Sequence, residues 1–423
     1  DVARFGDYAS PQYGTIKSSE NYERRFIMTF PNETLPKGRK QKTTALYDRF
    51  INKGAVMGDT FGLESVLWFA KNKEDAFEEP TIKRSRSHNY VSKEVINVRE
   101  NVGLIEVANF SKHEFKGPDA KKFLDYIMAG KLPKPGRISL SPMLTKKGKL
   151  YGDLTIACID ENEFMIFGSG AAQEMHRRWF ESHIKKFDVT YKNRSDEFHG
   201  LSIAGPRSRD LLQKVIREDI SNNKFKFRDS KKIYVAGVPA IVNRLSFTGE
   251  LGFEIYVAPH YQLKLYEELI NAGKEFNIKP FGTRALMSMR LEKNWGAWTL
   301  DYRPDFTAKE TGLDFFINWD KDFIGKELAK KDDSKNKLVP LVVETNDIDV
   351  TYNEAVLKGD QSIGYVTSGG FAHFVNKSVA LTYLDTNQLN SGKDIQVEIN
   401  GDLFNCSIIK EPLYDPSGQK MRS

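Results

Sequence analysis

The segment Tyr151-Gly-Asp153-Leu-Thr carries an acidic side chain at the point where a tight turn leads into an apolar stretch. We expect this position to bury part of the Asp153 carboxyl group. Burial raises the pKa of a carboxyl group, which makes it a usable proton acceptor near neutral pH. An aspartate that only caps the turn would have the same spacing, so the segment alone leaves both interpretations open.

Two glutamates bracket a glycine-containing turn in Ser246-Phe-Thr-Gly-Glu250-Leu-Gly-Phe-Glu254-Ile-Tyr256. Their even spacing places Glu250 and Glu254 on one face of an unbroken strand, although the glycines allow a bulge that turns one of them away. A buried carboxylate needs several hydrogen-bond donors. The adjacent N–H groups of an amino-pyrimidinone ring would provide them. A glutamate that belongs only to the turn is the alternative.

Arg284 and Arg290 lie on a helix predicted over residues 284–293, directly before Trp295 and Trp298. An arginine and aromatic rings beside a pocket suit a planar anionic ligand, through charge pairing and stacking. Either arginine could instead pair with a nearby acid as a structural bridge.

Two other features are interpreted as structural. The segment Phe167-Gly-Ser-Gly-Ala-Ala-Gln173 superficially resembles a dinucleotide-binding loop, but Gln173 stands where the third glycine belongs. We therefore expect a strand-to-helix turn capped by Ser169. Cys158 and Cys406 lie in apolar, strand-like stretches and are expected to be buried free thiols. Neither has a Cys-x-x-Cys partner, so no metal site is predicted.

The composition excludes several classes of protein. Hydrophobic residues make up 40% and aromatic residues 12% of the 423 residues, which is enough to form real cores. No apolar run is long enough to predict a membrane span. The net charge of +6 is small for this length and both signs are interspersed, so no nucleic acid partner is expected. Residues 1–10 lack the apolar core of a signal peptide, and the absence of an initial Met indicates a processed product or part of a longer chain.

Alternating strands and helices predict an α+β core. The order strand, Gly-Pro, helix occurs twice, at Gly117-Pro118 and at Gly205-Pro206, which indicates an internal duplication. The predicted helices cover residues 18–28, 44–53, 119–128, 171–187 (with Met175, Trp179 and Ile184 on one side), 207–216 and 261–276, and Val95, Val98 and Val102 fit another helix face. The predicted strands cover residues 103–107, 153–159, 163–167, 233–236, 238–247 and 252–257. Short strands at 339–343, 362–366, 379–383, 395–399 and 404–409 predict a small all-β barrel or sandwich at the end.

The ordered motifs resemble the aminomethyltransferase family, to which the T-protein of the glycine cleavage system belongs. No single motif is specific, but the set keeps its order and spacing over residues 95–423. The matching pieces are Gly117-Pro-Asp-Ala, Tyr151-Gly-Asp-Leu-Thr, Ser246-Phe-Thr-Gly-Glu-Leu-Gly-Phe-Glu, Arg284-Ala-Leu with Arg290-Leu-Glu-Lys, and Gly364-Tyr-Val-Thr-Ser-Gly-Gly.

Within that family, the chain most resembles the folate-binding half of dimethylglycine and sarcosine dehydrogenases. Its opening stretch is similar to the connector that those enzymes place between their flavin and folate halves. The matching pieces are Trp295-Gly-Ala-Trp298, Asp301-Tyr-Arg-Pro-Asp, Asp322-Phe-Ile-Gly-Lys-Glu and Pro412-Leu-Tyr-Asp-Pro-Ser-Gly, and in the opening stretch Arg4-Phe-Gly, Pro31-Asn-Glu, Pro36-Lys-Gly-Arg39, Gly54-Ala-Val-Met-Gly58 and Trp68-Phe-Ala.

The resemblance implies a three-lobed, folate-binding α+β fold that ends in a small β-barrel. The implied division is a connector (1–94), a folate-binding core (95–330) and the barrel (331–423). Asp153 matches the catalytic aspartate of the family. The expected cofactor-binding residues are Glu254, Arg284, Tyr151, Phe247, Tyr256, Glu250 and Trp298. Phe247 stands where the family motif usually has a tyrosine, so a hydroxyl contact is missing there or comes from elsewhere.

The implied activity is tetrahydrofolate-dependent capture of the carbon that a flavin enzyme removes from an N-methyl amine such as dimethylglycine or sarcosine. The product would be 5,10-methylene-tetrahydrofolate. Because the chain has no flavin-binding fingerprint, FAD is expected only on a missing N-terminal half or on a partner subunit. The expected compartment is the cytoplasm, or the mitochondrial matrix in a eukaryote. The alternatives are a stand-alone methyltransferase resembling the dimethylsulfoniopropionate demethylases, and a folate-binding module without catalysis.

Overall fold

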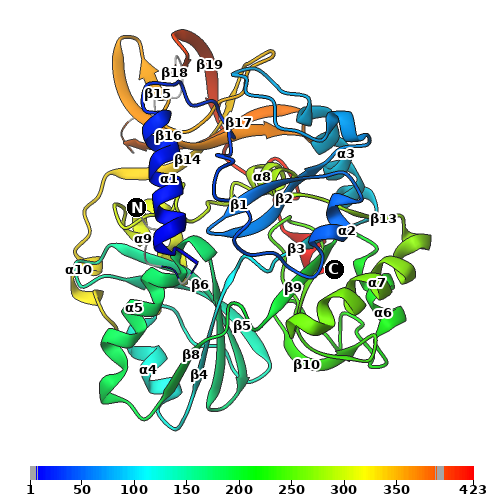
Figure 1. Ribbon diagram of the computed structural model, residues 1–423. Helices are drawn as coiled ribbons and strands as arrows, with labels where there is room; N and C mark the ends of the chain where they lie inside the picture. Colours follow the sequence, from blue (N-terminus) through cyan, green and yellow to red (C-terminus); the bar gives the residue numbers. More distant parts are fainter. Residues whose placement is uncertain (1–5, 7, 386, 388–394) are drawn as a thin grey trace.

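Two large β-sheets, a closed barrel and an N-terminal hairpin form the framework of the computed structural model, which describes residues 6, 8–385, 387 and 395–423 (Figure 1). In Figure 1 the barrel lies at the top of the view and the two sheets lie below it. This arrangement confirms the α+β fold with a C-terminal barrel that the sequence predicts.

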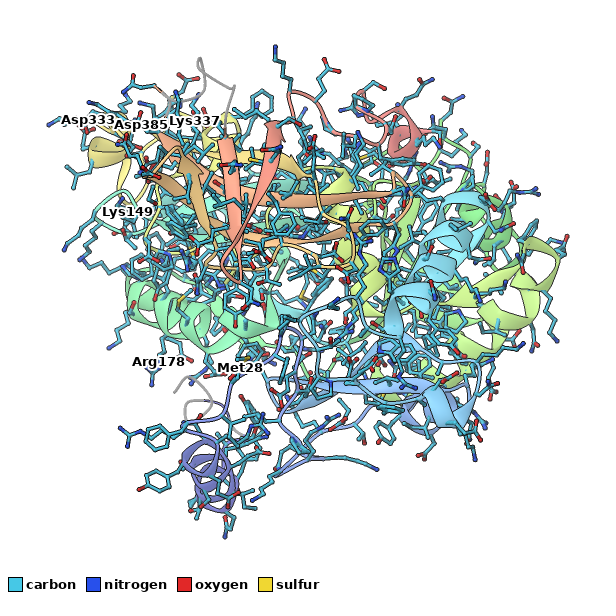
Figure 2. All side chains as sticks on the ribbon, turned by 90° about the horizontal axis from the view of Figure 1, so that it is seen from above. Met28, Lys149, Arg178, Asp333, Lys337 and Asp385 are labelled. Carbon is cyan, nitrogen blue, oxygen red and sulfur yellow. The ribbon has the colours of Figure 1, made fainter. Side chains whose placement is uncertain are left out.

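The N-terminal part consists of α1 (Pro11–Glu23), α2 (Tyr47–Ile51) and the antiparallel hairpin β1 (Ala55–Thr60) and β2 (Leu63–Phe69). α1 begins and ends earlier than the helix predicted over 18–28. The reason is that the Ser10 side chain caps it and that proline is well suited to the first helical position. α1 stands at one edge of the molecule in Figure 2, near Met28. Of the connector motifs, Arg4-Phe5 lies outside the described residues.

A six-stranded sheet in the order β10-β11-β12-β9-β3-β13 forms one lobe. Helices α6 (Ser208–Val215) and α7 (Gln262–Gly273) contribute to the core on one of its faces, where Leu211 and Leu265 join Phe253. The strands are β3 (Val102–Glu106), β9 (His199–Ala204), β10 (Ser230–Val235), β11 (Val238–Asn243), β12 (Gly252–Val257) and β13 (Ile278–Pro280).

A five-stranded sheet in the order β5-β6-β7-β4-β8 forms the second lobe. Helices α4 (Ala120–Ile127) and α5 (Gln173–His183) pack on its outer face through a core that includes Phe123, Phe180 and Ile166. The strands are β4 (Ser111–Lys116), β5 (Arg137–Leu144), β6 (Leu150–Asp160), β7 (Glu163–Gly168) and β8 (Thr190–Asn193). The pairing of β6 with β7 confirms the two strands predicted there.

The inner faces of the two sheets share an apolar core, which we call the inter-sheet layer. Every residue of β12 is buried, because its side chains alternate between this layer and the helix-covered core on the other face. The Phe167 and Tyr256 rings stack across the layer with their centroids 4.6 Å apart. The layer is formed around Ile105, Ala157, Met165, Phe167, Ile241 and Tyr256.

The two Gly-Pro turns have nearly the same backbone conformation. Gly117 has φ 138° and Gly205 has φ 133°, in a region that only glycine adopts readily. A Cβ atom would lie 2.7 Å from the Asp188 carbonyl oxygen at Gly117 and 2.3 Å from the Asn101 carbonyl oxygen at Gly205. Both turns lead into the helices that the sequence predicts after them, α4 and α6, and this equivalence agrees with an internal duplication.

The C-terminal barrel closes in the order β14-β17-β16-β15-β18-β19. Among the strands of this barrel, the hydrophobic pattern failed to predict the four-residue β15. Outside the barrel it also missed β1, β2, β4, β5 and β8. The strands are β14 (Asn336–Val343), β15 (Ala355–Lys358), β16 (Gln361–Ala372), β17 (Lys377–Asp385), β18 (Ile395–Ile399) and β19 (Asp402–Ile408).

Helix α3 (Ser87–Glu100) differs from the prediction at its end. Val95 and Val98 are fully buried on it, whereas Val102 begins β3, because Asn101 leaves the helical conformation. The implied boundary between residues 94 and 95 therefore falls inside α3, and the division into domains remains a proposal.

Helix α5 buries a different side from the one predicted. Its two buried residues are His176 and Phe180, whereas Met175 and Trp179 are only half-buried. Ser169 caps the preceding turn by accepting a hydrogen bond from the Ala171 N–H, as the sequence predicts.

A buried carboxylate, that of Asp301, joins the sheets to the barrel. Arg290 on α8 (Thr283–Glu292) donates to its Oδ2 over 2.8 Å, and the Ala297 N–H donates to the same atom over 2.9 Å. The hydroxyl groups of Thr367 and Ser368, both on β16, donate to Oδ1 over 2.6 and 2.7 Å. Arg290 thus forms the structural bridge that its position on the predicted helix allowed.

Replacing Asp301 by Asn should lower the free energy of unfolding by about 3 kcal/mol, because it leaves the buried Arg290 without its counter-charge. Urea denaturation followed by circular dichroism measures the change. Asp305→Asn is the matched control, since the Asp305 side chain is 72% exposed. A loss as small as that of the control would show that the junction does not depend on this charge.

Candidate active site

Asp153 lies on β6, on the face that meets the inter-sheet layer. Side chains alternate along a strand, so Asp153, Thr155 and Ala157 share one face, and Ala157 belongs to the layer. Asp153 pairs with Pro142 on β5, and Thr155 pairs with Phe167 on β7. A sheet interior therefore positions this carboxyl group, which favours a precisely held group over a mobile turn residue.

The environment of Asp153 changes its proton affinity. Burial raises the pKa of its carboxyl group to about 7, and a hydrogen bond from its own backbone N–H only partly opposes this shift. Its charge helps to raise the pKa of Tyr302, whose phenol is itself buried. A carboxyl group with a pKa near 7 can take up and release a proton at neutral pH.

His176 and two aromatic rings form a wall beside the Asp153 segment. The His176 Nε2–H donates to the Tyr151 carbonyl oxygen over 2.9 Å, and the Trp298 ring lies 5.8 Å from the imidazole. The Tyr151 ring packs on Trp179 at 4.6 Å. The structure thus brings Tyr151 and Trp298 together at His176, on the side of the sheet that α5 covers, whereas the Asp153 side chain faces the inter-sheet layer. His176 was not predicted, because nothing in its spacing distinguishes it from other residues of an amphipathic helix.

Glu254 lies on β12 in the facing sheet and is 6% exposed. The Tyr256 hydroxyl group donates to Glu254 Oε2 over 2.7 Å. Burial raises the pKa of Glu254 to about 7, while the hydrogen bond from Tyr256 and the charge of Lys112 oppose the shift. Because Tyr256 stacks on Phe167, Glu254 is attached to the same inter-sheet layer that Asp153 faces.

Lys112 is a further charged residue of this layer that the sequence analysis missed. It is fully buried on β4, and its Nζ lies 5.9 Å from the centroid of the Tyr256 ring. A lysine within the half-polar segment Ser111-Lys-His-Glu indicates an exposed position, so the pattern gave no signal for its burial.

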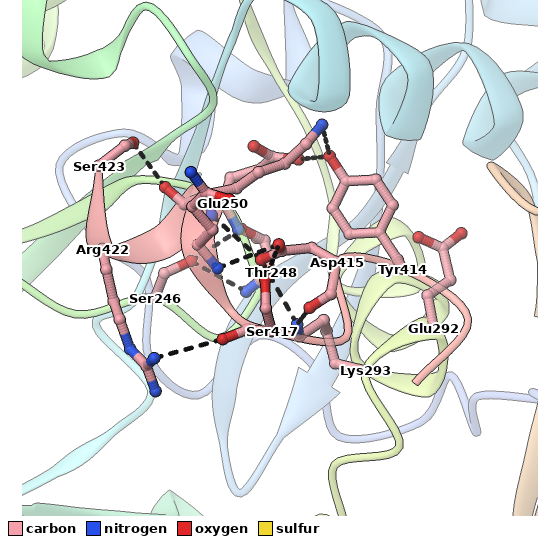
Figure 3. A network of polar contacts seen from close by, with 12 residues as sticks. Ser246, Thr248, Glu250, Glu292, Lys293, Tyr414, Asp415, Ser417, Arg422 and Ser423 are labelled. Carbon is pink, nitrogen blue, oxygen red and sulfur yellow. Dashed lines mark hydrogen bonds and ion pairs between the residues drawn. The ribbon is translucent and has the colours of Figure 1, made fainter. Parts of the chain in front are cut away.

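Glu250 belongs to a structural network rather than to the predicted site (Figure 3). It lies before β12, so it does not share a strand face with Glu254. Its carboxylate accepts hydrogen bonds from Arg99, over 3.1 Å, and from the Tyr414 hydroxyl group. Arg99 also donates to Glu292. The even spacing misled the prediction because the chain bends between the two glutamates, and we remove Glu250 from the site.

Arg284 and Phe247 have protein partners of their own. The Arg284 guanidinium group forms an ion pair with Glu78, with 2.8 Å between Nη2 and Oε2, and donates to the Ser87 hydroxyl group. The Phe247 ring is half-buried and stacks on Trp295 with 5.9 Å between centroids. No contact brings either residue to Asp153 or Glu254 within the part of the chain that the structure describes.

A cavity of about 280 Å³ lies between the connector and the start of α5, and none of the predicted site residues lines it. Its walls include Tyr8, Lys42, Gly170, Glu174 and Asp196. Among the described residues, no group of three or more His, Cys, Asp or Glu side chains could hold a metal ion. Likewise, none of the helices described is long and apolar enough to cross a membrane.

Three known families match parts of the chain. The family described as "GCVT N-terminal domain" matches residues 46–321, which is more than half of the chain. "Glycine cleavage T-protein C-terminal barrel domain" matches residues 336–415. "FAD dependent oxidoreductase central domain" matches residues 1–44.

Among curated relatives, the mitochondrial dimethylglycine dehydrogenase of Homo sapiens is 35% identical over 422 residues, which cover 98% of this chain and 48% of that protein. The chain thus spans about half the length of the dehydrogenases it matches. The aminomethyltransferase of Thermoanaerobacter pseudethanolicus is 30% identical over 330 residues, covering 76% of this chain and 89% of that protein.

A solved structure supports the fold. The glycine cleavage system aminomethyltransferase T from Bartonella henselae aligns with a TM-score of 0.77 at 22% identity, and the alignment covers 89% of this chain and 98% of that one.

The raised pKa of Asp153 predicts a pH-dependent stability. The folded chain binds this proton more tightly than the unfolded chain, so the stability that depends on Asp153 falls as the pH rises from about 4 to about 7. Asp153→Asn removes this titration and should stabilise the fold by about 4 kcal/mol more at pH 8 than at pH 4, because about three pKa units at about 1.4 kcal/mol each are lost. Urea denaturation at both values measures this. Asp160→Asn, an exposed change on the same strand, is the control, and equal effects of Asp153→Asn at both pH values would contradict the assignment.

Proposed function

The chain belongs to the glycine cleavage T-protein family of folate-dependent aminomethyl transfer proteins, and we propose that it is the folate-binding half of a flavin-dependent dehydrogenase acting on an N-methyl amine of the dimethylglycine or sarcosine type. It captures the carbon released by demethylation as 5,10-methylene-tetrahydrofolate. The similarity to dimethylglycine dehydrogenases over nearly the whole chain supports this choice over a stand-alone aminomethyltransferase.

A flavin-bearing part completes this proposal. Residues 1–44 match the central domain of FAD-dependent oxidoreductases, and the matched dehydrogenases are about twice as long as this chain. FAD therefore belongs to a preceding half or to a partner subunit in the proposal. The mitochondrial location of the mammalian relatives supports the matrix as the compartment if the source is a eukaryote.

Glu254 fits the demands of a reduced folate. A buried carboxylate can accept two hydrogen bonds from adjacent N–H groups in one plane, which a pterin ring presents. Glu254 is buried and has a tyrosine hydroxyl group on Oε2, so it is already oriented before a ligand arrives. When bound, tetrahydrofolate supplies a nucleophilic nitrogen that takes up the one-carbon unit.

Asp153 handles the proton in this proposal. Its carboxyl group faces the inter-sheet layer and, with a pKa of about 7, is partly ionised at neutral pH. The carboxylate holds the amine or accepts its proton while the carbon is transferred. Trp298, Tyr151 and Phe247 are further ligand contacts in this proposal; in the structure their rings pack on His176, Trp179 and Trp295. Arg284 reaches a ligand only if it leaves Glu78.

The buried Glu254 with its tyrosine partner, within a chain of this family, is the observation that carries the proposal. Titration with tetrahydrofolate under reducing conditions tests it. Trp295 and Trp298 should report binding through saturable quenching of fluorescence. Tight binding of FAD with no response to folate would contradict the assignment.

Glu254→Gln should weaken binding of tetrahydrofolate about ten- to a hundredfold, because the neutral amide offers one acceptor where the carboxylate offers two. Isothermal titration calorimetry at pH 8 measures the loss. Glu268→Gln, an exposed change on α7, should bind like the wild type. Similar affinities for the two variants would exclude Glu254 from the folate site.

Asp153→Asn should keep most of the folate affinity and lose about a hundred- to ten-thousandfold in turnover, the usual range for a general base. The assay joins the chain to its flavin-bearing part and measures methylene-tetrahydrofolate formed from an N-methyl amine. Wild-type turnover should fall as the pH drops below about 7, where Asp153 becomes protonated.

Asp160→Asn is the matched control for this assay, as an exposed aspartate of the same strand. If the Asp153 asparagine variant formed product at the wild-type rate, Asp153 would have no catalytic role. Product formed from an activated methyl donor without any flavin would instead favour the stand-alone methyltransferase.

A further inference from the structure

Lys112 is a buried cation in the middle of the proposed site. It is 0% exposed on β4, although lysine is among the residues that are almost never fully buried without a partner. Its Nζ donates to the carbonyl oxygens of Ala108, over 2.7 Å, and Ser195, over 3.3 Å. The two carbonyl groups are dipoles and carry no net charge. They fix the position of the ammonium group, but its positive charge still needs an anion nearby.

Three carboxylates act on Lys112: Glu106, Asp196 and Glu254. Two of them have other partners. Glu106 accepts a hydrogen bond from Gln262 over 2.5 Å, and Asp196 forms an ion pair with Lys42 over 3.2 Å. Glu254 has the Tyr256 hydroxyl group, which is neutral. Lys112 is the one cation found to act on Glu254 among the residues that the structure describes.

The Tyr256 ring connects the two charges. The Lys112 Nζ lies 5.9 Å from the ring centroid, and the hydroxyl group at the other end of the ring donates to Glu254 Oε2. Stacking on Phe167 fixes the ring. The cation, the ring and the carboxylate therefore form a continuous buried chain across the inter-sheet layer, from β4 in one sheet to β12 in the other.

We propose that Lys112 is a positioning residue that keeps Glu254 ionised and thereby makes the site selective for a planar heterocycle with two adjacent N–H donors. This inference rests on the proposed function. A carboxylate accepts both hydrogen bonds, whereas a protonated Glu254 would turn an O–H group toward one of the ligand N–H groups. The charge of Lys112 lowers the proton affinity of Glu254 in a place where burial raises it.

Lys112→Met removes the charge and keeps most of the side-chain volume. Tetrahydrofolate affinity should be measured from pH 6 to pH 9.5, since Glu254 titrates near pH 7 in the wild type. The midpoint of the pH profile should rise by about one unit, so that affinity falls about fivefold at pH 7 and about tenfold at pH 6. Burial lowers the pKa of Lys112 to about 7, so its charge acts on Glu254 mainly at and below neutral pH. The two profiles should therefore converge well above pH 7, where Lys112 has lost its proton and Glu254 is ionised in both proteins.

Two further variants separate this role from a structural one. Lys112→Gln keeps a donor for the backbone carbonyl groups and lacks the charge, so it should show the same shift. Lys116→Met changes a lysine of the same strand whose side chain is 47% exposed, and its profile should match the wild type. An unchanged midpoint in both Lys112 variants, or failure of both to fold, overturns the proposal.

A readout without folate keeps this test distinct from that of the function. Infrared difference spectroscopy with ¹³C-labelled glutamate follows ionisation of the Glu254 carboxyl group, which is assigned by its absence in Glu254→Gln. The pKa of Glu254 should rise in Lys112→Met whether or not folate binds. If the pKa rises but the wild type binds no folate, the proposed function fails and the inference about Lys112 and Glu254 stands. An unchanged pKa refutes the inference.

Discussion

The buried carboxylate of Asp301 sets how the barrel meets the two sheets. A charge without water around it must be fully hydrogen-bonded, and its donors come from α8, from the loop that follows and from β16. These elements therefore have one mutual arrangement. The same loop carries Tyr302, which lies close enough for the Asp153 charge to act on its hydroxyl group, so the surroundings of Asp153 depend on a contact made by the barrel. The charged groups of the candidate site come from the two sheets, but the barrel and the loop after α8 help to position its surroundings.

The inter-sheet layer combines two demands that oppose each other. Apolar side chains hold the sheets together, yet the layer also receives Asp153, Glu254 and Lys112, each of which burial makes harder to ionise. Helix-covered cores on the outer faces offset that cost, because each sheet is packed on both sides. The strands in turn hold the charged groups more rigidly than loops would. Groups whose pKa values lie near 7 are what proton transfer at neutral pH requires.

The sequence predicts only part of the framework of this layer, and it predicts the electrostatics of the layer poorly. Strands β6, β7 and β12 and the Gly-Pro turns follow from local hydrophobic patterns and from the needs of glycine, which act over a few residues. Strands β4, β5 and β8 were not predicted. Glu250 was misplaced because strand alternation says nothing about the bend before β12. Lys112 and His176 escaped notice because their burial depends on the opposite sheet and on α5 packing, which no local pattern encodes. The short strand β15 lacks a hydrophobic period long enough to detect.

The ion pair between Arg284 and Glu78 couples the position of the segment before α3 to ligand binding at Arg284 in the core. Glu78 also accepts the indole N–H of Trp68, over 2.7 Å, so the acid is anchored on the hairpin side. Any ligand that needs the Arg284 guanidinium group must displace Glu78. The segment carrying Glu78 is either paired with Arg284 or released from it. By linkage, release of the segment raises the affinity for such a ligand by the same factor by which the bound ligand favours release. A movement of this segment would thus change ligand binding in the core. The coupling free energy would be that of exchanging the Glu78 carboxylate for an anionic group of the ligand at the Arg284 guanidinium group.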